Sequence, residues 1–448
     1  MTTTTSHPMT ASSRTVARRS VAAASFGNAL EWYDFSVYAF FAGYVAHNFF
    51  LTNDPTSALI STFVVFGAGF VARPLGAVVV GMYGDRRGRK AALMLSMATM
   101  GIGTLVLAVT PPAAFIGFAA PVLLLVGRLL QGFSAGGEIG GAAAYLIEQA
   151  PPDRRARYAS WLQASMGISN LLSAIVGVTI TTLFSESAVN DWAWRIPFII
   201  GLLIIPVGLY IRRRLPETNT FEHHRTQERP KPNPLKRLLT EHPKAILTGF
   251  LFSVLWTVCV YALVIYAPTY YREESVGLGF TAQQSFTASL VGNIVLVVGC
   301  LLAGRLADRT GCKPVVIAGS LALLVLPLPC LLLLHARPTM AVLVTVHSLL
   351  CAAVAAFVGV APSTLPRAFP VAVRSTGLSL SYNIAAIFFA GFTPALMTWA
   401  TVRITVYAPA LWVAVGSLAC LIAVPALFRQ IHHVAADEDT DTLSLKHP

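Results

Sequence analysis

The chain has 448 residues, of which 55% are hydrophobic and 12% are charged, and its mean hydropathy of +0.66 excludes an ordinary soluble globular domain. A formal net charge of +12 can indicate nucleic-acid binding. Its distribution argues against a nucleic-acid partner, because 26 of the 32 Lys and Arg fall in cytoplasmic segments if the amino terminus lies inside, as the positive-inside rule requires.

Apolar runs of about 20 residues recur along the chain, and each is long enough to cross a bilayer as a helix. A transmembrane barrel would need alternating polar and apolar residues, which stretches such as LTGFLFSVLWTVCVYALVIY do not show. The sequence therefore predicts an all-α membrane protein with twelve transmembrane helices. The predicted spans are residues 21–48, 57–82, 91–110, 115–147, 158–184, 193–211, 245–271, 281–304, 314–334, 339–361, 375–402 and 406–428.

The first span follows a Thr- and Ser-rich tail over residues 1–20. It is longer than a signal-peptide core and has no obvious cleavage site, so we expect an uncleaved signal anchor. Its segment GNALEWYDFSVYAFF carries Glu31 and Asp34 one helical turn apart. An ionisable side chain near the bilayer centre costs about 2.5–3.5 kcal/mol on the insertion scale and usually faces a cavity or a partner. Both carboxylates are therefore candidate functional groups.

The remaining charged residues of the spans are Arg73, Arg128, Glu138 and Arg195, which also lie in the first half of the chain. The spans of the second half contain no Lys, Arg, Asp or Glu within the boundaries above. We expect the first half to titrate and the second half to supply neutral polar contacts and movement. If Asp34 pairs with Arg128, protonation of Asp34 releases the arginine and leaves a positive cavity that attracts an anion.

Three of these charges have a structural alternative. Arg195 follows Asp191 near the outer end of its span, where snorkelling to the interface explains it as well as substrate contact does. Glu138 can brace its helix against a neighbour. Glu31 can serve as a fixed partner of Arg73 instead of a second proton site.

Neutral polar residues of the spans are weaker candidates, because such side chains more often hold helices together. Asn170 shares a helix face with Gln163, and His347 is a candidate titrating group, with a packed histidine as the alternative. Pro268 and Pro394 can soften their spans for gating or make ordinary kinks. The residues expected to line the cavity are Tyr33, Gln131, Gln163, Asn293, Tyr382 and Asn383.

A short repeat divides the chain into two halves. GMYGDRRGRK at 81–90 returns as GRLADRTGCK at 304–313, 223 residues later and again after the second span of its half. Parallel six-span halves around a midplane site are a transporter plan, and they argue against a channel or a receptor. The predicted parts are the six-helix bundles 21–211 and 245–428, the cytoplasmic linker 212–244 and a cytoplasmic tail 429–448.

The repeated loops are candidate gates. Glycine allows close helix approach, and Asp85 and Asp308 can accept from helix amides or pair with an arginine of a neighbouring helix. The predicted gating residues are Gly81, Asp85, Arg86, Gly88, Arg89, Gly304, Asp308 and Arg309.

No enzyme motif is evident in the sequence. H-E-x-x-H and G-x-x-x-x-G-K-[ST] are absent, and no nucleophile has an identifiable base partner. The six cysteines form no C-x-x-C pair, which favours apolar fillers over metal ligands or disulfides. We expect neither a metal nor a cofactor, and a transporter that draws on an ion gradient.

At the repeated loops the sequence resembles the major facilitator superfamily, whose loop between spans 2 and 3 carries G-x-L-x-D-R-x-G-R-[RK]. Tyr83 and Cys312 depart from that pattern. A finer resemblance to the metabolite:H⁺ symporter family, which carries citrate, 2-oxoglutarate, shikimate and proline/betaine, rests on six segments, and the tricarboxylate branch is the most similar. The segments are GNALEWYDF, FVARPLG, GRLLQGFSAGGEIG, WAWRIPF, RRRLPET and FPVAVRSTGLSLSYN.

The resemblance implies a major facilitator fold in the inner or plasma membrane, with both termini cytoplasmic. It implies a proton-coupling role for Asp34 and Arg128, as in the related sugar porters. It also implies contacts of Arg73 and Arg195 with substrate carboxylates, as in the dicarboxylate members, since a guanidinium binds a carboxylate through two parallel hydrogen bonds.

The predicted function is proton-coupled symport of a small organic anion, a di- or tricarboxylate such as citrate, by alternating access in a monomer. The predicted partners are this anion, protons and the lipid bilayer. The alternative is a symporter of the same family for shikimate or for proline or betaine. A betaine needs an aromatic site for its ammonium group, which Trp32, Tyr33, Tyr261 and Tyr266 keep open.

Overall fold

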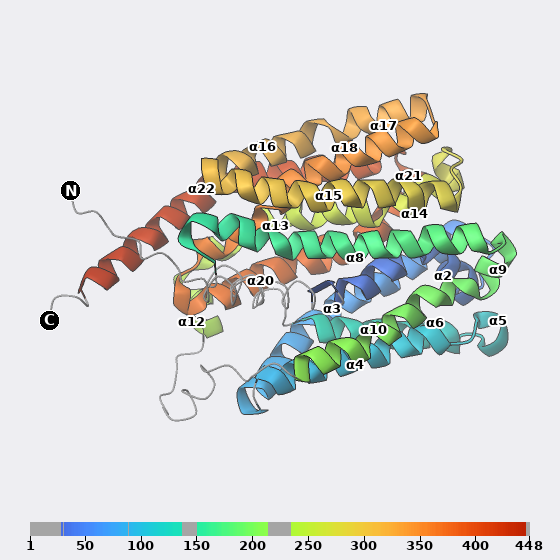
Figure 1. Cartoon of the computed structure of the whole chain (residues 1–448), viewed down its shortest axis with the longest axis horizontal. Coiled ribbons are helices and arrows are strands. Elements are labelled where there is room, and N and C mark those ends of the chain that lie inside the picture. Colours follow the sequence, from blue (N-terminus) through green and yellow to red (C-terminus); the bar gives the residue numbers. More distant parts are fainter. Residues whose placement is uncertain (1–27, 30, 88, 137–149, 214–233, 445–448) are drawn as a thin grey trace.

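The structure of the protein is a computed structural model, which describes residues 28–29, 31–87, 89–136, 150–213 and 234–444. Within these residues the chain is helical and contains no strand, so the all-α prediction is confirmed for them. The helices run along the longest axis of the molecule (Figure 1). Two predicted site residues, Gly88 and Glu138, lie outside the described residues, as do the tail 1–20 and most of the linker.

The first half begins with a helix over residues 31–40, which a turn at Phe41 separates from the next helix. Its other helices are α2 (Ala42–Phe49), α3 (Pro55–Arg87), α4 (Arg89–Val109), α5 (Ala113–Ile116), α6 (Ala119–Ala135), α8 (Arg155–Leu183), α9 (Glu186–Asp191) and α10 (Ile196–Arg213), with 3₁₀ turns η1 (Pro152–Arg154) and η2 (Ala193–Arg195).

The second half contains longer composite helices. Its elements are α12 (Pro234–Glu241), α13 (Pro243–Val260), η3 (Tyr261–Ile265), α14 (Ala267–Arg272), η4 (Glu274–Val276), α15 (Ala282–Thr310), α16 (Cys312–Val325), α17 (Pro327–Ala336), α18 (Met340–Val358), α19 (Ala361–Thr364), η5 (Leu365–Ala368), η6 (Val371–Val373), α20 (Arg374–Ala386), η7 (Ile387–Gly391), α21 (Thr393–Arg403) and α22 (Ala408–Ser444).

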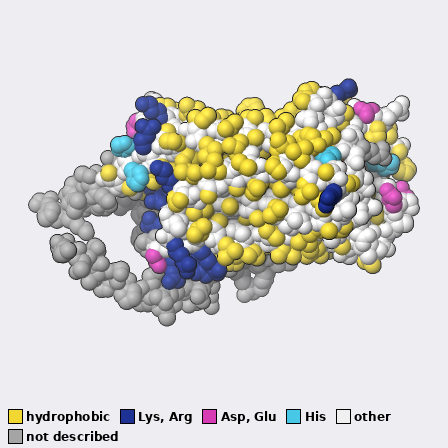
Figure 2. Space-filling model, turned by 90° about the horizontal axis from the view of Figure 1, so that it is seen from above, with side chains coloured by type: hydrophobic (Ala, Val, Ile, Leu, Met, Phe, Trp, Pro, Cys, Tyr) yellow, Lys and Arg dark blue, Asp and Glu magenta, His cyan; other side chains and the backbone are white. Residues whose placement is uncertain are grey.

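Many of these helices suit a bilayer. Among the described residues, 8 helical stretches are long and apolar enough to cross a membrane, and three shorter apolar helices accompany them. Hydrophobic side chains cover the middle of the face in Figure 2, and Lys and Arg gather at the end where α12 lies in Figure 1. The total of twelve spans and the side of the termini remain predictions.

The linker contains a helix that the sequence did not predict. In α12 the leucines Leu235, Leu238 and Leu239 recur at helical spacing within a charged segment, and only Leu238 is fully buried. The helix therefore packs against the protein through one buried leucine. One buried position does not make the repeating apolar pattern from which a helix is predicted.

Two composite helices of the second half each contain a π-helical turn just before a proline. The turn η3 precedes Pro268, and η7 precedes Pro394. Because proline has no amide hydrogen and its ring collides with the preceding turn, a wider turn accommodates it. The sequence left softened helices and ordinary kinks open at these prolines, and the structure has an irregular turn of five residues before each of them.

The helices α8 and α15 lie side by side and join the two halves of the chain (Figure 1). Near one end Gln283 donates to the hydroxyl of Thr182 at 3.1 Å. Near the other end a side chain on Gly304 would collide with Ser160. Small residues thus allow the contact to continue along both helices.

The helices α3 and α6 approach even more closely, because glycines face each other. A Cβ atom on Gly132 would collide with the carbonyl oxygen of Gly69, and one on Gly136 would collide with the carbonyl oxygen of Arg73. This contact holds the backbones that carry Arg73 and Arg128 against each other.

We expect Gly132→Ala to destabilise the protein by about 1–3 kcal/mol, because the backbones of α3 and α6 must separate to admit a methyl group. The six cysteines are free and five are buried, so a thiol-reactive fluorophore can follow thermal unfolding in detergent. Gly43→Ala is the control, since no atom lies within 4 Å of a Cβ there. Equal melting temperatures for the two variants would contradict this account of the helix contact.

Candidate functional site

Arg73, on α3, is buried among aromatic rings and has no hydrogen-bonding partner within the described part of the chain. Its side chain is 1% exposed, and its guanidinium carbon lies 4.2 Å from the ring centroid of Phe70, 5.0 Å from Phe35 and 5.5 Å from Trp32. None of its three side-chain nitrogens has a hydrogen-bond partner among the described residues. Since a buried charge is costly unless it is paired, this cation is a candidate site for an anion.

Arg128, on α6, is a second buried cation beside the first. It is fully buried, and its guanidinium carbon lies 4.5 Å from the ring of Tyr38 and 4.7 Å from those of Phe35 and Phe66. Both guanidinium carbons lie within 5.0 Å of the centroid of Phe35, so they are less than 10 Å apart. The Nε and Nη2 atoms of Arg128 also lack partners within the described part of the chain.

Asp34 is connected to Arg128 through two other side chains. Its Oδ2 atom accepts a hydrogen bond from Thr104 at 2.5 Å. Gln131 donates to the Thr104 hydroxyl at 2.9 Å and accepts from Nη1 of Arg128 at 2.7 Å. The sequence left a pair of Asp34 with Arg128 as a possibility, and in the structure hydrogen bonds of Thr104 and Gln131 connect the two side chains.

Glu31 is buried on the same helix, 5% exposed. The alternative in which it is the fixed partner of Arg73 predicts a hydrogen bond between the two side chains. All three nitrogens of Arg73 lack such a bond in the described residues, and aromatic rings surround the guanidinium instead. A role of Glu31 in proton coupling stays a prediction.

Three of the other predicted lining residues make specific contacts with neighbouring side chains or backbone. Tyr33 donates to the carbonyl of Pro197 at 3.2 Å and so braces the first helix against α10. Asn293 is buried, donates to Ser289 at 2.7 Å and leaves its Oδ1 atom without a partner among the described residues. Tyr382 packs its ring against Trp256 at 5.1 Å.

Two further predicted residues make fewer specific contacts. Gln163 is buried on α8 and Asn383 is half-buried on α20. The neighbour of Gln163 on its helix face, Asn170, is hydrogen-bonded to Ser36. Their part in substrate binding stays a prediction.

His347 belongs to a separate buried cluster in the second half. Its Nδ1 atom lies 2.9 Å from the hydroxyl of Tyr271, and its Nε2 atom lies 3.6 Å from the sulfur of Cys351. This arrangement matches the packed, hydrogen-bonded histidine that the sequence left as an alternative.

Arg195 lies apart from the two buried arginines. It is half-buried at the junction of η2 and α10, stacks on Trp194 at 4.3 Å, and donates to the carbonyls of Asp191 at 3.3 Å and Thr110 at 3.1 Å. These contacts fit the alternative in which Arg195 holds helix ends together, and its predicted role in substrate binding is untested.

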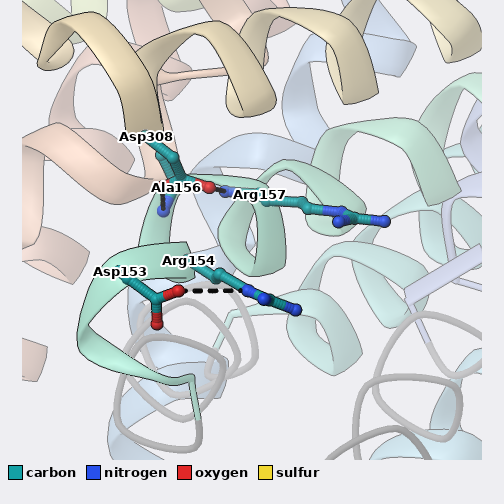
Figure 3. A network of polar contacts seen from close by, with 5 residues as sticks. All are labelled: Asp153, Arg154, Ala156, Arg157 and Asp308. Atoms are coloured by element: carbon teal, nitrogen blue, oxygen red, sulfur yellow. Dashed lines mark hydrogen bonds and ion pairs between the residues drawn. The ribbon is translucent and has the colours of Figure 1, made fainter. Parts of the chain in front are cut away.

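The second copy of the repeated motif joins the two halves. Asp308, near the end of α15, accepts from the backbone amides of Ala156 at 2.9 Å and Arg157 at 3.1 Å (Figure 3). These amides open α8 and have no partner within their own helix, so the carboxylate caps it from outside. Gly304 is buried and Arg309 is exposed on the same helix.

The first copy of the motif is described only in part. Gly81 is exposed, with no atom within 4 Å of a Cβ built there. The side chains of Asp85, Arg86 and Arg89 lie outside the description, and Gly88 does so entirely. Their gating role stays a prediction.

We expect Asp308→Asn to slow turnover several-fold with little change in KM, because a cap of this kind contributes about 1 kcal/mol to the contact between the halves. Initial rates of substrate exchange in proteoliposomes measure both quantities. Asp153→Asn is the matched control, since that exposed carboxylate pairs with the neighbouring Arg154 at 3.1 Å (Figure 3) and, among the described residues, accepts no hydrogen bond from a backbone amide of the other half. Unaltered turnover in Asp308→Asn would make the contact merely structural.

Thr104 is the functional candidate that sequence reasoning missed. It is fully buried and bonds to both Asp34 and Gln131. One signal could have found it: Gly103 lies beside it, and a small residue in an apolar helix permits the close approach to α6 that the hydroxyl needs.

Known proteins resemble the chain over most of its length. The sequence profile of the Major Facilitator Superfamily matches residues 24–381. A citrate-proton symporter of Salmonella typhi is 35% identical over 92% of this chain and 94% of its own length. A proline/betaine transporter of Escherichia coli K12 is 34% identical over 85% of this chain and 77% of its own length. A solved proton:xylose symporter bound to 6-bromo-6-deoxy-D-glucose superposes with a TM-score of 0.74 at 17% identity, over 93% and 96% of the two chains.

Proposed function

The chain belongs to the major facilitator superfamily, and on that premise we propose that it is a proton-coupled symporter of a small di- or tricarboxylate such as citrate. It is a multi-pass protein of the inner membrane and a transporter. The observation that carries the proposal is Arg73, a buried guanidinium whose three nitrogens lack hydrogen-bond partners among the described residues. A carboxylate supplies two acceptors in the geometry that a guanidinium prefers.

A second guanidinium favours a substrate with more than one carboxylate. Arg128 lies less than 10 Å from Arg73 and keeps two nitrogens without partners in the described part of the chain. Two cations on one aromatic cluster repel each other, and a dianion or trianion between them relieves that repulsion. A monocarboxylate would pair with only one of the two guanidinium groups.

Asp34 is the residue that binds the transported proton in this proposal. With Asp34 and Glu31 ionised, the two carboxylates balance the charges of Arg73 and Arg128. Protonation of Asp34 leaves one positive charge in excess, which strengthens the attraction for the substrate anion. Proton and anion then cross the membrane together, because each favours binding of the other.

Alternating access requires two parts that move relative to each other. We propose that these are the six-helix bundles 21–211 and 245–428, twelve helices in all with both termini in the cytoplasm, acting as a monomer. The contact of Asp308 with the first amides of α8 joins the bundles at one end, so it must break when that end opens. The wide turns η3 and η7 supply places where helices of the second bundle can bend.

A proline or betaine symporter is the second candidate, since transporters of these solutes are about as similar to the chain as the citrate symporters. The observation that favours it is Tyr261, which is buried beside Phe70 at 5.5 Å and Trp32 at 6.5 Å. Such rings can hold an ammonium group. In this structure, however, the face of Phe70 is already taken by Arg73.

Uptake by purified protein in proteoliposomes tests the proposal. Labelled citrate is offered with and without an inward proton gradient, with tricarballylate, 2-oxoglutarate, shikimate, proline and betaine as competitors. The proposal expects accumulation that an uncoupler abolishes and that carboxylates compete. If only proline or betaine enters, the carboxylate assignment fails and the second candidate replaces it.

A further inference from the structure

The hydrogen bonds between Arg128 and Asp34 have a direction that chemistry fixes. An arginine only donates, so the atom of Gln131 that faces Arg128 at 2.7 Å must be its carbonyl oxygen. The amide nitrogen of Gln131 therefore faces Thr104 at 2.9 Å and donates to the Thr104 oxygen. These two hydrogen bonds do not fix which acceptor receives the single hydroxyl proton of Thr104.

Two acceptors lie within reach of that proton. The Oδ2 atom of Asp34 is 2.5 Å from the Thr104 oxygen, and the carbonyl oxygen of Met100 is 3.1 Å from it. An ionised Asp34 can only accept, so the hydroxyl then donates to the carboxylate. A protonated Asp34 carries a donor of its own, which can occupy the second lone pair of the Thr104 oxygen.

We propose that Thr104 is a positioning residue that converts protonation of Asp34 into a change at Arg128 by reversing the direction of its hydrogen bond. This inference rests on the proposed proton coupling. When a proton from water binds Oδ2 of Asp34, the Thr104 hydroxyl turns to the carbonyl of Met100 and its oxygen accepts from Asp34. The oxygen then has two donors, so the bond from Gln131 weakens and Gln131 holds Arg128 less firmly.

The packing around these groups supports such a relay. Gly103 and Gly127 bring α4 and α6 together, and a side chain on either would strike the opposite backbone. This approach is what lets Gln131 reach Thr104. On the other side, a Cβ atom on Gly201 of α10 would lie 2.6 Å from Oδ1 of Asp34, so bare backbone confines the carboxylate to the Thr104 side.

Few other titratable groups surround the relay. Among the described residues, the titratable groups that face Asp34 or its partners are Glu31, Tyr33 and Tyr38 on its own helix, Arg73 on α3, Arg128 on α6 and Tyr261 on η3. The neighbouring residues Thr104 on α4 and Gly201 on α10 do not titrate. A change in the titration of Asp34 on removal of the Thr104 hydroxyl therefore reports on that hydrogen bond.

Infrared difference spectroscopy of the purified full-length protein tests the relay without any substrate. The carboxylic C=O band that Asp34→Asn removes is assigned to Asp34 and followed against pH. A hydrogen bond that stabilises the ionised form is lost in Thr104→Val, so the band should persist to a pH about one unit higher than in the wild type. Thr104→Ser should restore the wild-type titration, because it keeps the hydroxyl.

Controls separate this inference from the proposed function. Thr99→Val makes the same replacement on the same helix, where the hydroxyl donates only to carbonyls of its own helix, and should leave the band in place. If Thr104→Val does not fold, Thr104→Ala replaces it. A band that titrates identically with and without the hydroxyl overturns the relay, even if proton-driven uptake occurs. A shifted band in a protein that accumulates no carboxylate overturns the proposed function and keeps the relay.

Discussion

Replacing Asp34 with asparagine is expected to abolish proton-driven accumulation of substrate and to leave exchange of substrate across the membrane intact. Asparagine imitates a permanently protonated carboxyl in shape and charge, since it is neutral and its amide nitrogen can donate to the Thr104 oxygen next to it. The carrier can therefore bind substrate and change conformation, but it can no longer take up and release a proton. Accumulation should fall to the level reached without a gradient.

The measurement compares uptake into proteoliposomes under an inward proton gradient with counterflow at equal pH on both sides. Asp191→Asn is the control, because this residue is exposed and undergoes the same chemical change outside the hydrogen bonds that connect Asp34 with Thr104 and Gln131. Accumulation that survives in Asp34→Asn would remove Asp34 from coupling and would make Glu31 the next residue to test.

Replacing Arg73 with lysine is expected to raise the apparent KM for the carboxylate roughly tenfold or more, with a smaller effect on maximal rate. The guanidinium offers a planar pair of donors and stacks on Phe70, Phe35 and Trp32. An ammonium keeps the charge but gives up the second hydrogen bond and the flat contact. One hydrogen bond to a charged group contributes about 1.5–3 kcal/mol, and each 1.4 kcal/mol is a factor of about ten.

Concentration-dependent uptake by Arg73→Lys provides the test, with Arg337→Lys as a control on the exposed surface. Arg195→Lys distinguishes the two predicted carboxylate ligands, because Arg195 already donates to two backbone carbonyls. An unchanged KM in Arg73→Lys combined with a raised KM in Arg195→Lys would move the substrate to the outer end of α10.

The buried charges could be predicted from the sequence, but their partners could not. A charge within an apolar span is conspicuous because insertion into a bilayer is costly, so Asp34, Arg73 and Arg128 stand out without a structure. Which groups they contact depends on helix rotation and on side-chain length. Thr104 is one of several hydroxyl residues on α4, and the neighbouring Gly103 marks the helix contact without showing which hydroxyl reaches Gln131.

The fold, too, could be predicted in part: the helices followed from the sequence, and their local irregularities did not. Helical spans follow from hydropathy, because lipid leaves the backbone no other partner than itself. The π-helical turns before Pro268 and Pro394 do not follow, since a proline in a helix can be accommodated by a kink, a wide turn or a break. The contact of Asp308 was among the two possibilities that the motif left open, and the structure distinguishes them.

The guanidinium of Arg73 has no hydrogen-bond partner among the described residues, which bears on the stability of the carrier as well as on substrate binding. Aromatic faces surround this buried cation, so under the proposed function the cargo supplies the hydrogen-bond acceptors that its nitrogens lack. Loading then adds to the cohesion of the native state, by an amount that grows with cargo concentration relative to the dissociation constant. Melting temperatures of the purified protein, measured with one metabolite at a time, should therefore rise most with the substrate that it binds.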